Sequence, residues 1–139
     1  MQIRPFDPTT DLQLVEGWLD RRHVAHARGR ADLLPPTGFV VDESLVGFLF
    51  RTDAPGVAYL DCFASDPSSD KERVRRAMIV LVARLQEEAR ASGVRMLHGS
   101  TAIPSILQAC QANGWTVGTS KPYTGLTFAI VALDTKETN

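Results

Sequence analysis

The stretch YLDCFASDPSSDKERVRRAMIVLVARLQEEARASG, from Tyr59 to Gly93, decides the fold of this chain. It opens with a short apolar segment ending at Ala64, crosses the polar turn from Ser65 to Asp70, and becomes a long amphipathic helix. A strand that enters a helix through a polar turn is a common anion-binding arrangement, because free backbone N–H groups point outward at a helix N-terminus. This turn contains no glycine, so large side chains stand where a phosphate would have to approach the backbone.

The helix and the segment after it predict a strand–helix–strand unit. Gly93 is suited to end the helix in a left-handed conformation, and residues 94–98 are typical of a strand. Two strands joined through a long helix pair in parallel by a right-handed crossover, so we expect Tyr59–Ala64 and Val94–His98 to be parallel neighbours. The apolar stripe of the helix is formed by Val74, Ala77, Met78, Leu81, Leu85 and Ala89.

The rest of the chain alternates strand-like and helix-like segments without an internal repeat or an interdomain linker. Before the central unit we expect a strand over 2–6, a helix from Asp11 to about Arg22, a hairpin of 38–41 with 45–50, and a strand over 57–64. After it we expect a helix over 102–113, a strand over 115–117, a turn over 121–123 and a strand over 126–131.

Composition narrows the class of protein. With 139 residues, 44% of them hydrophobic and 22% charged, the chain is expected to form one soluble, cytoplasmic domain. A net charge of −1 gives no case for nucleic acid or a membrane surface, although Arg21-Arg22 and Arg73–Arg76 are local basic clusters. Cys62 and Cys110 lie in apolar segments without metal-ligand spacing, which favours a reducing compartment. No apolar run approaches the ~18 residues that a membrane span needs.

The order of these elements resembles the GNAT superfamily of acyl-CoA-dependent N-acyltransferases. The resemblance implies one GNAT-like α/β (α+β) domain over residues 1–133, followed by a polar tail over 134–139. It also implies a mixed central sheet of six to seven strands flanked by about four helices. The pieces that match are Ser65–Pro67, the helix from 74 to 91, the strand over 93–97, and the closing helix 107–113 with Gly114-Trp115.

The cofactor loop departs from the family pattern, Gln/Arg-x-x-Gly-x-Gly/Ala, whose backbone amides bind the CoA pyrophosphate. Anchored on Pro67, its three defined positions are occupied by Asp70, Arg73 and Arg75, none of which matches. A carboxylate repels a pyrophosphate, so the motif is degenerate. Two interpretations of the arginines Arg73, Arg75 and Arg76 remain open: guanidinium groups that replace the amide cradle, or solvated helix residues.

The resemblance also proposes catalytic positions. Asp61 occupies the strand that often carries a carboxylate base in such enzymes, and backbone N–H groups near Ala64 and Ser65 correspond to the carbonyl-binding position. His98, at a strand end, is a second candidate base. Each has a structural alternative, an ion-paired Asp and a hydrogen-bonding His. Cys110 stands where many members place a Tyr that reprotonates the CoA thiolate.

Two functions follow from these observations. The first is a GNAT-fold protein without standard catalysis, a binding or structural module that acts through protein partners or self-association. Degenerate members are also encoded by phages, so a role at a virion and a role in the bacterial cytosol are both open. The alternative is an acyl-CoA-dependent N-acetyltransferase with an atypical cofactor loop. It would use acetyl-CoA or another acyl-CoA, a small or protein amine, and Asp61 or His98 as base. No metal and no nucleic acid are expected in either case.

Overall fold

The computed structural model describes residues 1–26, 28–101, 103–118 and 127–133. Three α-helices, one short 3₁₀ helix and seven strands lie within these residues. Their order along the chain is β1 (Ile3–Pro5), α1 (Pro8–Arg21), η1 (Ala31–Leu33), β2 (Thr37–Val41), β3 (Leu45–Arg51), β4 (Val57–Ser65), α2 (Lys71–Ala91), β5 (Met96–Thr101), α3 (Pro104–Ala112), β6 (Thr116–Val117) and β7 (Thr127–Ala132).

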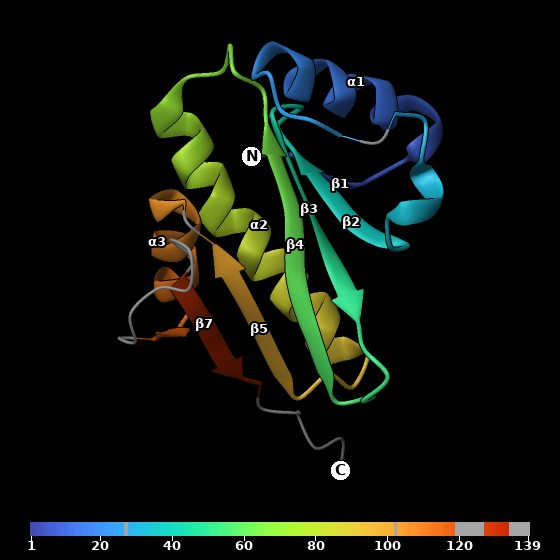
Figure 1. Cartoon of the computed structure of the whole chain (residues 1–139). Coiled ribbons are helices and arrows are strands. Elements are labelled where there is room, and N and C mark those ends of the chain that lie inside the picture. The colour runs from blue at the N-terminus through green and yellow to red at the C-terminus, as the bar shows by residue number, and fades with distance from the viewer. Residues whose placement is uncertain (27, 102, 119–126, 134–139) are drawn as a thin grey trace.

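The strands form one mixed sheet in the order β1-β2-β3-β4-β5-β7-β6. Only the central pair of β4 with β5 is parallel among the pairings that the structure describes, as the strand–helix–strand unit predicts. The remaining pairs are antiparallel. Figure 1 shows α2 and α3 behind the sheet, while the front of β5 and β7 is free of the described helices.

Alternation along the strands produces two apolar clusters, one on each face of the sheet. The larger cluster packs Leu81 and Leu85 of α2 against residues such as Leu49, and the smaller packs Trp18 of α1 against Val46. Successive strand residues point to opposite faces, so a continuous apolar strand serves both helical layers.

The structure revises several expected boundaries. β5 begins later and runs further than the predicted 94–98, so His98 lies within a strand that continues to Thr101. Antiparallel pairing with β7, which starts at Thr127 opposite Thr101, causes this extension. The sheet has the predicted number of strands, whereas three α-helices and η1 stand where about four helices were expected. The turn over 121–123, the strand start at 126 and the tail over 134–139 lie outside the described residues.

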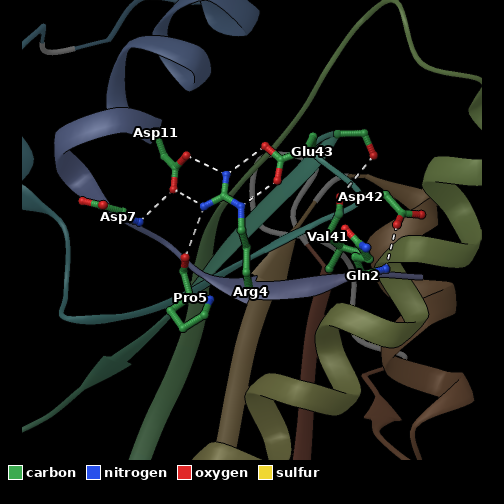
Figure 2. Close-up of polar contacts among 9 residues, drawn as sticks. Gln2, Arg4, Pro5, Asp7, Asp11, Val41, Asp42 and Glu43 are labelled. Carbon is green, nitrogen blue, oxygen red and sulfur yellow. Dashed lines mark hydrogen bonds and ion pairs between the residues drawn. The ribbon is translucent and has the colours of Figure 1, made fainter.

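An ion-pair network connects β1 to α1 and to the β2–β3 turn (Figure 2). Arg4 on β1 donates two hydrogen bonds of 2.7 Å to the buried carboxylate of Asp11 on α1, and it also donates to Glu43 in the β2–β3 turn. Asp42 and Glu43 have φ angles of 50° and 53°, as a tight type I′ hairpin requires. The backbone N–H of Gln2 donates to the Asp42 carboxylate at 2.8 Å.

Candidate functional site

A β-bulge interrupts β4 at the centre of the sheet. Val46 of β3 pairs with Ala64 and Phe48 pairs with Asp61, so two residues of β4, Cys62 and Phe63, lie opposite the single residue Gly47. Cys62 has a φ of 58°, a left-handed conformation that costs a non-glycine residue about 1 kcal/mol. Bulges re-aim side chains and end strand pairing, and this one lies where β4 leaves its parallel neighbour.

β4 and β5 separate immediately after their last paired residues, Tyr59 and His98. β4 continues to Ser65 along β3, while β5 continues to Thr101 along β7. The gap holds a cavity of about 150 Å³, which we call the splay cavity. It is lined by residues of both strands and by Cys110 of α3.

Gly99 keeps this cavity open. A Cβ atom built on Gly99 would meet only the Leu60 carbonyl oxygen at 3.7 Å and the Trp115 ring at 3.9 Å, both ordinary contacts. Gly99 has no positive φ, so the position accepts other residues without backbone strain. A larger side chain there would therefore occupy the cavity without disturbing the strand.

Asp61 lines the splay cavity. One of its carboxylate oxygens accepts the Cys62 backbone N–H at 2.7 Å, which fixes the side chain at the bulge. A carboxylate oxygen has more than one lone-pair direction, so Asp61 keeps acceptor capacity for a ligand N–H.

Two thiols line the same cavity, and both hold their protons tightly. Although Cys62 is exposed overall, nearby protein atoms desolvate its thiol and raise its pKa, with the charge of Asp61 as the second cause. Burial raises the pKa of Cys110 to about 11. The thiol of Cys110, at the position that the resemblance assigns to a tyrosine acid, is therefore protonated at neutral pH and lines the splay cavity.

His98 is placed away from the splay cavity. Its ring stacks on Tyr59 with a centroid separation of 5.5 Å, and Tyr59 stacks on Phe50 at 5.0 Å. His98 does not line the cavity, whereas the next two residues along β5, Gly99 and Ser100, do. Of the two predicted bases, the structure therefore brings only Asp61 to the cavity.

A wider groove of about 650 Å³ adjoins the cavity at Phe63 and runs to the N-terminus of α2; we call it the outer groove. Ala64 and Ser65, the predicted carbonyl-binding positions, line it. Arg22, just after α1, donates to the Ser65 carbonyl at 3.2 Å and to the Ser65 hydroxyl at 2.9 Å. Arg22, Lys71 and Arg75 give the groove three cationic side chains.

The N-terminus of α2 carries its own anion. The Asp70 carboxylate accepts the Arg73 backbone N–H at 3.0 Å and caps the helix. Asp66, also in the turn, accepts from the Ser68 N–H and hydroxyl, and these bonds lower its pKa. Two carboxylates therefore occupy the turn where a phosphate-binding loop presents free amides, and this end does not fit an amide-bound pyrophosphate.

The three predicted arginines do not come together. Arg75 lines the outer groove, where it pairs with Glu72. Arg73 and Arg76 line a different surface pocket beside Met1, and Arg73 pairs with Asp42 at 3.4 Å. Residues three apart share a helix face and residues two apart do not, so helical spacing already separates Arg75 from the other two.

Arg22 is a groove residue that sequence reasoning did not assign. The sequence marked Arg21-Arg22 as a basic cluster, but only the tertiary contact with Ser65, across 43 positions, places it beside β4. Among the described residues, no group of three metal-binding side chains converges. None of the described helices combines the length and apolar character that crossing a bilayer requires.

Comparison with known proteins agrees with this geometry. No protein-family model matches the sequence, and no curated protein matches it. Among solved structures, ribosomal-protein-S18-alanine N-acetyltransferase from Escherichia coli has a TM-score of 0.71 at 16% identity, with 99% of this chain and 97% of that chain covered. A GNAT-family acetyltransferase from Streptococcus pneumoniae has a TM-score of 0.67 at 13% identity, with 96% and 99% covered.

Rv2747 from Mycobacterium tuberculosis, solved in complex with CoA, has a TM-score of 0.73 at 12% identity, with 96% of this chain and 99% of that chain covered. Identities this low bear on fold alone, and the agreement spans nearly the whole length of each protein. Together with the parallel β4–β5 pair and its separation at the bulge, the comparisons show that this chain has the fold of the GNAT acetyltransferases.

Proposed function

We propose that the protein binds an acyl-CoA in the splay cavity and outer groove and transfers the acyl group to an amine. The observation that carries the proposal is the separation of β4 from β5 at the bulge, which leaves an open cavity at the centre of the sheet. Core positions are normally filled to close packing, so an unfilled opening between two central strands favours a ligand.

The residues present fit one part of this cofactor and not another. The splay cavity and outer groove are adjacent, since Phe63 and Ile103 line both, and together they have the extent that an extended thioester arm needs. The pyrophosphate end lacks an amide cradle, so we assign its recognition to the side chains of Arg22, Lys71 and Arg75.

The chemistry needs little from the protein. A bound acyl-CoA would supply an activated carbonyl and a thiolate leaving group, which can depart unprotonated and then take up a proton from water. Asp61, fixed by the Cys62 N–H, is positioned to take the proton that the attacking amine releases. The backbone at Ala64 and Ser65 would orient the carbonyl.

A second candidate is a binding module of the same fold without catalysis. It is favoured by the Asp70 cap, which places negative charge where pyrophosphate would lie, and by the presence of Cys110 at the position of the tyrosine acid. Such a module would act through protein partners or self-association, in a cell or at a virion.

Calorimetric titration with CoA and acetyl-CoA tests binding. We expect a micromolar Kd that weakens at least tenfold in Arg22→Ala/Arg75→Ala, because each charge-assisted phosphate contact contributes about 1.5–3 kcal/mol. Arg73→Ala/Arg76→Ala removes equal charge from the other side of α2 and is the matched control, with an expected change under threefold. Gly99→Leu, which fills the splay cavity, is expected to abolish binding.

A measurement of acyl transfer distinguishes the acyltransferase from the binding module. Release of free thiol from acetyl-CoA is followed with a panel of small and peptide amines, for the unmodified protein and for Asp61→Asn. Amine-dependent release that falls at least tenfold in Asp61→Asn supports the transferase. Binding without release for any amine supports the module, and absence of binding at millimolar acetyl-CoA overturns the proposal.

A further inference from the structure

A second cavity lies on the other side of the β4 bulge. It has a volume of about 270 Å³ and lies between α1, the segment around η1 and β4; we call it the apolar cavity. Most of the side chains that line it are aliphatic or aromatic, among them Phe6, Leu12, Val15, Leu19, Leu33 and Leu34. An apolar cavity of about 150 Å³ is enough for a benzene ring, so this one has room for an aryl or branched alkyl group.

The apolar cavity and the splay cavity meet at the bulge. Cys62 and Phe63 line both cavities, and Phe63 also lines the outer groove. The bulge makes this sharing feasible, because the left-handed Cys62 redirects the backbone between the two faces of the sheet. A group held in the apolar cavity is therefore adjacent to the point where the splay cavity reaches Asp61.

The polar groups at the edge of the apolar cavity are engaged by the protein itself. The Glu16 carboxylate accepts the Gly29 N–H at 2.9 Å, and Arg30 pairs with Asp32 at 2.9 Å. His26 Nε2 lies 2.9 Å from an oxygen of Asp20. Each of these groups already has a partner in the protein and the rest of the lining is apolar, so the cavity favours a hydrocarbon group over a charged one.

We infer that the apolar cavity binds the alkyl or aryl group of one of the two substrates that meet at the bulge. This inference rests on the proposed transferase function and specifies its substrate class. The group is either the tail of an acyl chain longer than acetyl or the apolar side chain of the acceptor amine. Both sources share one chemistry, and a titration series distinguishes them.

The first arm of the experiment measures Kd for acetyl-, butyryl- and hexanoyl-CoA. The second measures Kd for methylamine, butylamine and phenethylamine without any CoA compound, so it stands even if acetyl-CoA fails to bind. We expect one of the two series to tighten about three- to fourfold for each buried CH₂ group. The series that tightens identifies which substrate carries the apolar group.

Two variants test whether the increase in affinity with hydrocarbon length arises in the apolar cavity. Leu12→Trp adds bulk from α1, and Leu33→Trp adds it from η1, where Leu33 is 54% exposed and tolerates change. Both are expected to remove the chain-length dependence while leaving acetyl-CoA affinity within twofold. Gln13→Trp adds the same bulk on the exposed side of α1 and is the matched control.

The inference is overturned if neither series depends on hydrocarbon length, or if the dependence survives in both cavity-filling variants. Acetyl-CoA that binds without any length dependence would reject this inference alone and leave the transferase proposal intact. Amines that tighten with size while acetyl-CoA does not bind would support the cavity assignment and reject the transferase.

Discussion

At the residue scale, one glycine determines how the bulge packs. A Cβ atom on Gly47 would lie 2.6 Å from Cε1 and 2.7 Å from Cδ1 of the Phe63 ring, and 3.0 Å from a methyl of Leu81. Gly47 does not have a positive φ, so space and not backbone freedom requires glycine here. Its bare Cα lets the Phe63 ring lie against β3, beside all three openings.

Gly47→Ala is therefore expected to destabilise the protein by about 1–3 kcal/mol, the usual cost of overpacking a filled site. Urea unfolding measures this free energy. Gly47→Ala/Phe63→Ala removes the clashing ring, so its destabilisation should be smaller than the sum of the two single changes. Gly17→Ala, in α1 with nothing within 4 Å of its Cβ, is the control and should stabilise by about 0.5–1 kcal/mol. Equal losses at Gly47 and Gly17 would contradict this account.

At the scale of an element, the N-terminus of α2 is capped by the Asp70 carboxylate, which stands where an anion would otherwise bind. Asp70→Ser keeps a capping oxygen and removes the charge, so we expect unfolding stability within ~0.5 kcal/mol of the unmodified protein. Loss of repulsion should tighten CoA binding by about 1 kcal/mol, roughly fivefold. Asp70→Ala removes the cap as well and should cost about 1 kcal/mol of stability.

Calorimetry and thermal unfolding on these two variants separate charge from capping. Both variants lack the carboxylate and should gain affinity for CoA, whereas only Asp70→Ala should lose stability. Weaker CoA binding in both variants would mean that the Asp70 carboxylate contributes to recognition of the ligand. The group bound beside Asp70 in the outer groove would then have to be a polar group other than a phosphate.

At the scale of the whole molecule, Arg4 pairs with Asp11 and Glu43 and so joins β1, α1 and the β2–β3 turn. These ion pairs make the free energy of unfolding depend on pH. Hydrogen bonds from Arg4, the largest cause, and from the Asp7 N–H hold the pKa of Asp11 below its ordinary value of 3.8. The unfolded chain thus takes up this proton at a higher pH than the folded chain. The stabilisation is complete well above pH 3.8 and is lost as pH falls through the folded pKa.

Asp11→Asn should cost about 2 kcal/mol at pH 7, because it leaves the Arg4 guanidinium with a weaker partner while Arg4 itself is partly hydrated. The difference from the unmodified protein should shrink as the pH falls below 3.8 and Asp11 becomes protonated. Chemical unfolding at a series of pH values measures both quantities. Asp53→Asn, in an exposed turn, is the control and should change stability by less than ~0.5 kcal/mol. A pH-independent difference for Asp11→Asn would contradict the assignment.

Features of the fold that depend only on neighbouring residues along the chain could be predicted from the sequence. Apolar spacing identified α2, and its link to β5 identified the parallel pair. The absence of glycine from Ser65 to Asp70 predicts that the turn lacks an amide cradle. These features are local, since side-chain period and capping follow from a few consecutive residues. Helical spacing also separates Arg75 from Arg73.

Which side chains line the splay cavity and the outer groove depends on tertiary contacts. The bulge at Cys62 depends on the register between β3 and β4, and the stacking of His98 on Tyr59 depends on pairing across a crossover helix. Arg22 reaches Ser65 because α1 packs against β4, a contact between segments 43 positions apart. A strand pattern repeats every two residues and fixes neither register nor partner, so the site emerges only when the sheet is assembled.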